Sequence, residues 1–256
     1  MIEEKVRILE HESLTDKYFL LTLKSRYISE NAIPGQFVNI RVRDSISPLL
    51  RRPISIHQVN SKEKTFKLLY EVIGSGTETL SKHKPGDEVD VLGPLGKGFS
   101  FEGDNAILVA GGMGIAPLAF LAWELLNNNK KVSIFIGTKT KNFTICEGAL
   151  KNAGAEVHFA TEDGSYGNKG LVTDILSSRI THYSLLVTHI YSCGPKVMLK
   201  EVAKIAKKNN LPCQVSMEAY MACGIGACYG CALESRSGYK MCCKDGPVFN
   251  AEEIKW

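Results

Sequence analysis

The sequence lacks the features that mark a secreted or nucleic-acid-binding protein. Its N-terminus, Met1-Ile2-Glu3-Glu4-Lys5, opens with charged residues, and no apolar segment typical of a secretory signal follows. The net charge is only +4, with no basic block and no basic stretch rich in aromatic residues. We therefore expect a cytoplasmic protein that does not bind nucleic acid, with its eight cysteines in a reducing environment.

The sequence also has no long uninterrupted hydrophobic run. The longest stretch without charged residues, 106–123, approaches the length needed to span a membrane. Glycines at 111, 112 and 114 and the proline at 117 divide it into a strand, a turn and the start of a helix. We therefore expect no membrane segment.

Hydrophobic periodicity predicts a barrel followed by an α/β unit. Residues 1–101 contain short alternating runs between Gly and Pro turns, which predict a small antiparallel β-barrel. Residues 102–212 predict a parallel sheet with crossover helices, the strands at 106–110, 132–137, 156–160 and 184–191 and the helices at about 116–128, 147–153, 171–178 and 195–209. Residues 213–256 begin with a strand and continue into a cysteine loop, with little room for a core of their own.

The cysteine loop has the spacing of an iron–sulfur site. Cys223-x4-Cys228-x2-Cys231, followed by Cys242-Cys243, matches the plant-type [2Fe-2S] pattern, in which thiolates hold both irons. The glycines between these cysteines suit a loop that folds tightly and leaves N–H groups near the sulfurs. By spacing alone, either Cys242 or Cys243 can be the fourth ligand.

Other interpretations of these cysteines remain open. Four thiolates also suit a tetrahedral Zn²⁺ ion, and a disulfide cluster would suit a secreted chain. Zinc sites usually pair their ligands as two Cys-x2-4-Cys units, whereas here three candidate ligands sit together and the fourth follows about a dozen residues later. The spacing therefore favours an iron–sulfur cluster.

The barrel segment carries an Arg-Pro-x-Ser motif. Arg52-Pro53-Ile54-Ser55 lies on a predicted strand, on which Arg52 and Ser55 can face one surface. There the guanidinium would bind a phosphate and the hydroxyl the polar edge of a ring. The alternative is an edge strand begun by a proline, with Arg51 and Arg52 solvated.

A glycine turn follows the predicted strand at 65–72. Gly74-Ser75-Gly76-Thr77 ends that strand and begins a short helix, so its free N–H groups are expected to hold a pyrophosphate. Ser75 and Glu78 also match a capping box, which needs no ligand.

The sheet segment carries two motifs at strand ends. Residues 111–117, Gly-Gly-Met-Gly-Ile-Ala-Pro, join the first strand to the first helix, where doubly wound sheets bind nucleotides. Pro117 replaces the third glycine of the usual motif, in the first helical turn. Residues 191–195, Tyr-Ser-Cys-Gly-Pro, end a later strand and are expected to line the same crevice, where Cys193 is either functional or a small buried hydrophobe.

In this order and at these separations, the motifs resemble those of the ferredoxin-NADP reductase superfamily. The cysteine loop and the ending Cys243-Lys244-Asp245-Gly246-Pro247-Val248-Phe249 are similar to the electron-transfer subunit of type B dihydroorotate dehydrogenase, and this likeness covers essentially the whole chain. In that family the fourth ligand directly precedes x-Asp-Gly-Pro-Val-Phe. The resemblance therefore leaves Cys242 as an extra thiol and implies the metal ligands Cys223, Cys228, Cys231 and Cys243.

The resemblance also implies a role for each part of the chain: an FAD-binding barrel domain at 1–101, an NAD-binding domain at 102–212 and a [2Fe-2S] subdomain at 213–256. NAD would bind over Gly112, Gly114 and Pro117, with its nicotinamide near Cys193, the candidate catalytic residue. FAD would be held by Arg52, Pro53, Ile54, Ser55, Leu69, Tyr70, Glu71, Gly76 and Thr77.

One departure from the superfamily concerns the flavin. Many members carry a Tyr, stacked on the flavin, between the Arg and the Ser of the first motif, and this chain has Ile54 there. Tyr70 is a candidate to supply an aromatic face instead.

The implied cofactors define a path for electrons. Nicotinamide moves a hydride and an iron–sulfur cluster passes single electrons, so a flavin must stand between them. In the family, a separate FMN-containing catalytic subunit oxidises dihydroorotate to orotate in pyrimidine biosynthesis, and its electrons reach NAD⁺ through the cluster and FAD. This chain lacks a dihydroorotate site, so the resemblance implies a complex containing two copies of each chain, with the cluster near the subunit interface.

Rival functions are distinguishable. A ferredoxin-NADP transhydrogenase subunit or an oxygenase reductase would share the cofactors, but in the transhydrogenase type an Asp replaces the first cluster cysteine, and this chain has Cys223. A zinc-binding interaction module would be colourless and free of flavin. Lys139 and Lys141 follow the second sheet strand, where they can meet a 2′-phosphate, so NAD rather than NADP rests on the resemblance alone.

Overall fold

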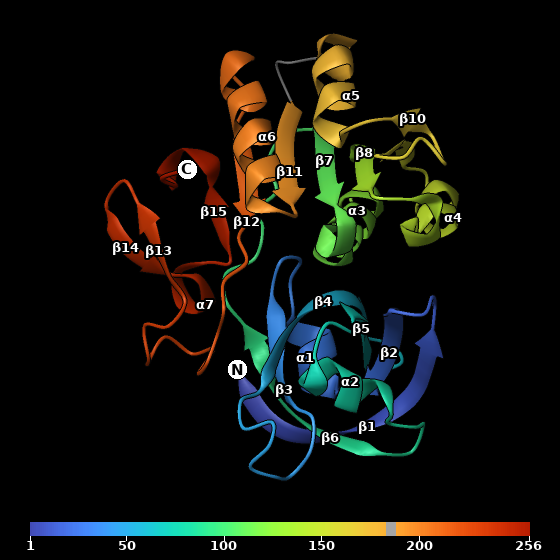
Figure 1. Cartoon of the computed structure of the whole chain (residues 1–256), viewed down its shortest axis with the longest axis vertical. Coiled ribbons are helices and arrows are strands. Elements are labelled where there is room, and N and C mark those ends of the chain that lie inside the picture. The colour runs from blue at the N-terminus through green and yellow to red at the C-terminus, as the bar shows by residue number, and fades with distance from the viewer. Residues whose placement is uncertain (183–187) are drawn as a thin grey trace.

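The computed structural model describes residues 1–182 and 188–256, and its N-terminal part is the predicted antiparallel barrel (Figure 1). Two short helices, α1 (Arg26–Asn31) and α2 (Ser75–Ser81), lie in the connections between strands. Inward-facing side chains of neighbouring strands, such as Ile40 and Ile54, fill the barrel with an apolar core. The closed barrel has the order β1-β2-β5-β4-β3-β6, with β1 (Ile2–Ser13), β2 (Tyr18–Lys24), β3 (Phe37–Arg41), β4 (Arg52–Asn60), β5 (Thr65–Glu71) and β6 (Glu88–Leu95).

The other half of the molecule is built on a seven-stranded sheet of order β10-β9-β8-β7-β11-β12-β15. Its parallel strands are β7 (Asn105–Gly111), β8 (Lys131–Thr138), β9 (Glu156–Thr161), β10 (Asn168–Lys169), β11 (Thr188–Cys193) and β12 (Cys213–Ser216). The helices are α3 (Ile115–Asn127), α4 (Glu147–Asn152), α5 (Val172–Arg179) and α6 (Lys196–Lys208), with the 3-10 segments η2 (Lys141–Phe143) and η3 (Ile180–His182).

The predicted strands and helices of this half are confirmed where the structure describes them. The strand predicted at 184–191 is present as β11 from residue 188, and residues 184–187 lie outside the described residues. The uncharged stretch 106–123 forms β7, the 3-10 turn η1 (Gly112–Gly114) and the first part of α3, as predicted. Within the described ranges, no helix is both long and apolar enough to cross a membrane.

The C-terminal residues share the sheet with the preceding part of the chain. β15 (Val248–Asn250) pairs antiparallel with β12 at the sheet edge. Between them, the hairpin β13 (Ala232–Ser235) and β14 (Gly238–Met241) and the short helix α7 (Cys242–Asp245) lie beside the barrel (Figure 1), before the final segment η5 (Ala251–Glu253). Their buried side chains pack with Phe37 and Leu95 of the barrel and Leu199 of α6, so this segment depends on both halves for its core.

Buried His57 joins the barrel to α3. Its Nδ1 lies 2.9 Å from the carbonyl oxygen of Ala116, and its ring packs edge-on against Trp123. Burial, which outweighs the bond to Ala116, lowers the pKa of His57 to about 4. The ring is therefore neutral at pH 7, with Nδ1–H donating to the helix carbonyl.

We predict that acid weakens the folded protein through His57. Its folded-state pKa of about 4 lies below the ordinary value of 6.5, so the unfolded chain takes up the proton first and stability falls as the pH drops from 6.5 towards 4. A shift of this size corresponds to about 3 kcal/mol over the whole range. In His57→Asn, whose amide replaces the Nδ1–H donor, this contribution should vanish.

Urea unfolding of both proteins at pH 7 and pH 5 measures the difference. An equal loss of stability in the wild type and in His57→Asn would contradict the prediction.

Candidate cofactor and electron-transfer site

A cavity of ≈ 950 Å³ lies where the barrel meets the carboxyl ends of the parallel strands. The barrel contributes Tyr18 and Glu71, the latter from the predicted FAD strand. The sheet contributes the turn at 111–114 and Gly194 and Pro195 after β11. The cavity therefore brings together motifs from both halves of the chain.

The glycine turn leaves space for a ligand on one side and packs tightly on the other. Gly112 has a φ of +52°, and a Cβ added to it would meet nothing within 4 Å. A Cβ on Gly114 would lie 2.0 Å from the carbonyl oxygen of Cys193, so only glycine fits there. Pro117 is buried in the first turn of α3, as predicted. Open space in front of a helix N-terminus fits a pyrophosphate.

Cys193 lies behind this turn and not on the cavity wall. Its side chain is 3 % exposed, and burial, more than the nearby Glu218, strongly raises the pKa of its thiol. The thiol is therefore protonated and packed in the core of the sheet. A catalytic role for Cys193 stays a prediction, and its packing is that of a small buried hydrophobe.

Sequence reasoning missed Glu218, which lines the cavity together with Glu71. Burial raises the pKa of Glu218, and the negative charge of Glu71 raises it further. Its position in the sequence could have indicated this role, because Glu218 comes just after β12. The carboxyl end of β12 lies at the same edge of the sheet as the carboxyl ends of β7 and β11. A carboxyl group with a raised pKa in a cleft is a candidate functional residue.

Of the two candidate lysines, only Lys139 reaches the cavity. The Nζ of Lys141 lies 5.8 Å from the ring centroid of Tyr166, which places it over that ring. Carboxylates outnumber lysines on the cavity wall, where Lys17 and Lys139 are accompanied by Glu71, Glu162, Asp174, Glu201 and Glu218. Such a wall opposes the binding of an additional phosphate.

Arg52 stands at the rim of the barrel, against α2. A Cβ added to Gly76 would lie 1.9 Å from its Nε, so this glycine makes room for the guanidinium. Among the described residues, Arg52 forms no ion pair, whereas Arg51 is bound by Glu3 and Asp90. Arg51 therefore has a structural role, and Arg52 keeps its charge available for an anion such as a phosphate.

Two expectations for this region are wrong. Arg52 and Ser55 do not share a surface, because β4 pairs regularly with β3 over these residues and its side chains alternate. The Ser75–Glu78 capping box is also absent. Helix α2 begins at Ser75, so Ser75 is its first helical residue and Gly74 is its N-cap. The hydroxyl of Thr77 caps the helix instead, and accepts the N–H group of Ile73 at 3.0 Å.

The ring of Tyr70 is buried and does not line the cavity, so its proposed contact with the flavin stays a prediction. The side chain is 3 % exposed and belongs to the barrel core, stacked on Phe19, with its hydroxyl 2.9 Å from Nε2 of His11. Its neighbours on β5 face the other way: Leu69 packs with the core of the sheet, and Glu71 lines the cavity.

The cysteine loop brings the predicted cluster ligands together in two pairs. The thiol of Cys223 contacts that of Cys228, and the thiol of Cys243 contacts that of Cys231. Each sulfur also accepts a backbone N–H group, among them Gly226 N–H to Cys243 at 3.1 Å and Ala227 N–H to Cys223 at 3.3 Å, with longer contacts from Gly230 to Cys228 and from Cys243 to Cys231.

Backbone N–H groups favour the ionised form of the Cys223 thiol. Burial opposes ionisation of Cys223, but the N–H groups of Ile225, Cys228 and Ala227 outweigh it and lower the pKa of the thiol to about 6. Burial, followed by Cys231, raises the pKa of Cys243 to about 12. A metal ion would remove that proton on binding, since a coordinating thiol is deprotonated.

Cys242 points away from the pairs. Its thiol is fully buried and donates to the carbonyl oxygen of Met217 at 3.2 Å, and burial raises its pKa to about 12. The tertiary structure thus gives the thiols of Cys242 and Cys243 different partners, whereas the sequence spacing could not distinguish between these two residues.

The donor set fits a binuclear cluster. In the part of the chain that the structure describes, no three Cys, His, Asp or Glu side chains converge as they would around one metal ion. Two thiol pairs match two irons that each take two thiolates, and N–H groups directed at sulfur suit an iron–sulfur cluster. A single tetrahedral zinc ion would need all four sulfurs around one point.

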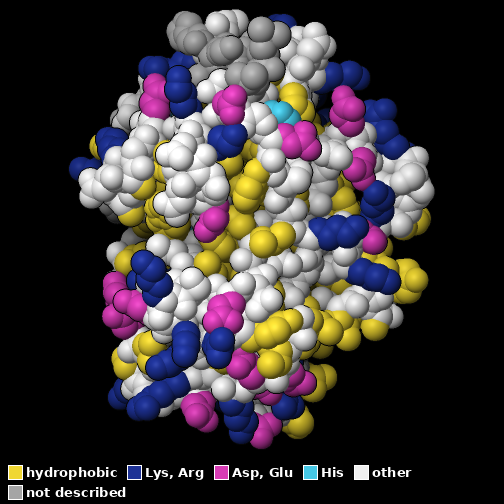
Figure 2. Space-filling model, turned by 180° about the vertical axis from the view of Figure 1, so that it is seen from behind, with side chains coloured by type: hydrophobic (Ala, Val, Ile, Leu, Met, Phe, Trp, Pro, Cys, Tyr) yellow, Lys and Arg dark blue, Asp and Glu magenta, His cyan; other side chains and the backbone are white. Residues whose placement is uncertain are grey.

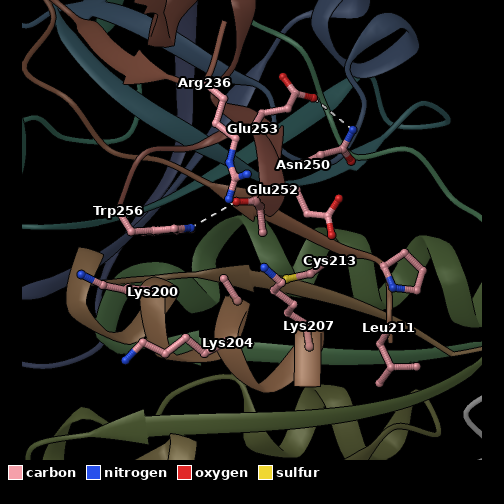
Figure 3. A pocket seen from close by; sticks show the side chains of 14 residues that line it. Lys200, Lys204, Lys207, Leu211, Cys213, Arg236, Asn250, Glu252, Glu253 and Trp256 are labelled. Carbon is pink, nitrogen blue, oxygen red and sulfur yellow. Dashed lines mark hydrogen bonds between the residues drawn. The ribbon is translucent and has the colours of Figure 1, made fainter. Parts of the chain in front are cut away.

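A second cavity, of ≈ 570 Å³, lies between α6 and the C-terminal residues (Figure 3). Lys207 and Arg236 extend into it from opposite walls, with the ring of Trp256 at one side. None of the predicted cofactor residues line it.

Comparisons with known proteins agree with this geometry. The family model described as the iron-sulfur cluster binding domain of dihydroorotate dehydrogenase B matches residues 218–255, and the oxidoreductase NAD-binding domain matches residues 108–204. The dihydroorotate dehydrogenase B (NAD(+)) electron transfer subunit of Desulforamulus reducens is 41% identical over 90% of this chain and 89% of its own length. The subunit of the same name from Bacillus caldolyticus is 40% identical over 98% of both chains.

A solved structure is similar over almost the whole chain. One chain of an NADH-dependent reduced ferredoxin-NADP oxidoreductase superposes with a TM-score of 0.89 at 30% identity, over 98% of this chain and 90% of the other. A ferredoxin NADP⁺ reductase from Neisseria gonorrhoeae, at 18% identity and a TM-score of 0.68, shares the fold.

We predict that Cys243→Ser loses the cluster whereas Cys242→Ser keeps it. The Cys243 sulfur lies in a thiol pair, and the Cys242 sulfur bonds to a backbone carbonyl that a serine hydroxyl also reaches. Iron and acid-labile sulfide, measured per flavin, check the prediction. A cluster retained in Cys243→Ser and lost in Cys242→Ser would reverse the assignment.

Proposed function

Because the chain belongs to the family of dihydroorotate dehydrogenase B (NAD(+)) electron transfer subunits, we propose that it carries electrons to NAD⁺ from a separate, FMN-containing catalytic subunit that oxidises dihydroorotate to orotate. Its cofactors are FAD, a [2Fe-2S] cluster and NAD. When bound, FAD would supply both hydride exchange with nicotinamide and single-electron exchange with the cluster. The chain itself would hold these groups and align them at the cavity between its two halves.

One observation carries the proposal: the large cavity lies between the predicted FAD strand and the predicted NAD turn. Glu71 of β5 and Gly112 face the same space, so a flavin on the barrel and a nicotinamide on the sheet would meet there. Glu218 lines this space and is followed closely by Cys223, so the segment that closes the cavity also begins the cysteine loop.

Each group of proposed site residues would bind a different cofactor or a different part of one. Arg52, with its unpaired charge, would bind the FAD pyrophosphate beside Gly76 and Thr77, while residues 53–55 and 69–71 would support the rest of the cofactor. Gly112, Gly114 and Pro117 would form the NAD turn, and the cysteine pairs would hold the cluster. Domain boundaries near residues 101 and 212 follow from this division.

The acidic cavity wall supports NAD over NADP. NADP carries an additional phosphate, and the carboxylates that outnumber Lys17 and Lys139 on the wall would repel it. This repulsion should weaken as salt screens it.

Exposed apolar and aromatic side chains around the cysteine loop form a candidate docking surface for the partner subunit. Tyr220 is 98 % exposed, Tyr229 67 % and Ile225 47 %, and all three belong to the segment that carries the cluster ligands. Aromatic side chains are enriched in protein interfaces. On the rear face, hydrophobic side chains also reach the surface among charges of both signs (Figure 2). We propose that the catalytic subunit covers the loop, in a complex with two copies of each chain, in the cytoplasm.

An anaerobic titration of the purified chain with NADH tests the function. We expect the flavin and cluster absorbance bands to bleach together, and NADPH to be less effective, because its additional phosphate meets an acidic wall. Adding the catalytic subunit and dihydroorotate should produce NADH from NAD⁺. A colourless protein that binds zinc would overturn the proposal.

We predict that Arg52→Ala weakens FAD retention by about tenfold or more, because a charge-assisted bond to phosphate contributes about 1.5–3 kcal/mol. Arg51→Ala is the matched control, because that guanidinium is already bound by carboxylates. Flavin absorbance after desalting measures both. Unchanged flavin content in Arg52→Ala would remove Arg52 from the pyrophosphate site.

A further inference from the structure

Asn39 connects the barrel directly to the cysteine loop. It lies on β3, is 1 % exposed, and its Nδ2 donates to the carbonyl oxygen of Cys223 at 3.3 Å. A Cβ added to Gly224 would lie 2.0 Å from the same Nδ2, so the glycine makes room for this amide. Gly224 also has a φ of +71°, which favours glycine. The loop is thus shaped around the Asn39 side chain.

The position of Asn39 on its strand places it opposite the proposed FAD motif. In the pairing of β3 with β4, Asn39 is the partner of Pro53. Its neighbour of the same strand face, Phe37, packs in the core that contains Cys231 and Cys243. One residue therefore contacts the first cluster cysteine while its own backbone lies beside the strand proposed to carry the flavin.

The amide is held in this orientation at a cost. Oδ1 of Asn39 is the one buried side-chain oxygen or nitrogen, among those of the described residues, that has no hydrogen-bond partner. Turning the amide over would place this oxygen against the carbonyl oxygen of Cys223, where two acceptors repel. A buried acceptor without a partner calls for an explanation beyond local stability.

We propose that Asn39 is a positioning residue for electron transfer, which fastens the Cys223 end of the cluster to the flavin-bearing face of the barrel and raises the reduction potential of the cluster. This inference rests on the proposed function. The donor end of the amide points at the Cys223–Gly224 peptide. A positive dipole end beside the site favours the added electron, as hydrogen bonds and local charge do in other iron–sulfur proteins.

Two substitutions of Asn39 with side chains of similar size distinguish the effect of losing the hydrogen bond to Cys223 from the effect of added charge beside the cluster site. Asn39→Leu removes the donor and stays neutral, whereas Asn39→Asp removes the donor and adds a negative charge at the same place. We expect the midpoint potential of the cluster to become more negative in both variants, and further so in Asn39→Asp. The cluster EPR signal should change in both, because the Cys223 end is no longer fixed.

A matched control separates these effects from general destabilisation. Thr22 is likewise buried in the barrel, where its hydroxyl donates to Glu10 at 3.0 Å, away from the cysteine loop. Thr22→Val should therefore lower stability without changing the cluster potential or its EPR signal.

The experiment is an EPR-monitored redox titration of the flavin- and cluster-loaded protein in complex with its catalytic subunit, with iron and sulfide assayed in parallel. A more negative cluster potential, or cluster loss, in the Asn39 variants but not in Thr22→Val supports the proposal, and a more positive potential in the Asn39 variants overturns it. An unchanged potential and EPR signal in both Asn39 variants, or equal cluster loss in the control, overturns it. A wild-type protein without flavin and cluster would overturn the proposed function as well, which distinguishes the two failures.

Discussion

The contact between the barrel and the sheet is the constraint on which the rest of the structure depends. Each half contributes a side chain to the core of the other: Phe120 of α3 packs in the barrel core, and Leu69 of β5 packs in the core of the sheet. Between them, neutral His57 bonds to the Ala116 carbonyl. Apolar burial supplies the attraction and the buried hydrogen bond gives it direction. Because surfaces of both halves form the large cavity, any slippage at this contact would move β5 relative to the glycine turn at 111–114.

The C-terminal segment depends on the same contact for a different reason. It is too short for a core of its own, so β12 and β15 join the edge of the large sheet, while the buried cysteines pack against Phe37 and Leu95 of the barrel. The cysteine loop is therefore positioned by both halves at once. Backbone N–H groups donate to the sulfurs of Cys223 and Cys243, and Asn39 donates to the carbonyl oxygen of Cys223, so hydrogen bonds hold the loop around its thiols.

Chemically similar neighbours receive different roles from their surroundings. Arg51 is bound by carboxylates and Arg52 is left with its charge unpaired. Cys242 and Cys243 are adjacent in the chain, yet one bonds to a backbone carbonyl and the other to the cluster loop. In both pairs the difference arises from side-chain direction, since consecutive residues leave the backbone on different sides.

The sequence by itself determined the architecture and the chemical character of the site. Alternating and continuous apolar runs predict barrel and parallel sheet, because the period of burial is a local property of the chain. Cysteine spacing and the glycine turns likewise predict ligand chemistry from neighbours in sequence.

Only the tertiary structure decided how distant residues meet. It buried the ring of Tyr70, placed Arg52 and Ser55 on opposite strand faces, and brought Glu218 to the cavity and Asn39 to Cys223. These outcomes depend on strand pairing and on the packing of the two halves, which join residues far apart in the chain and leave no periodic signal within it.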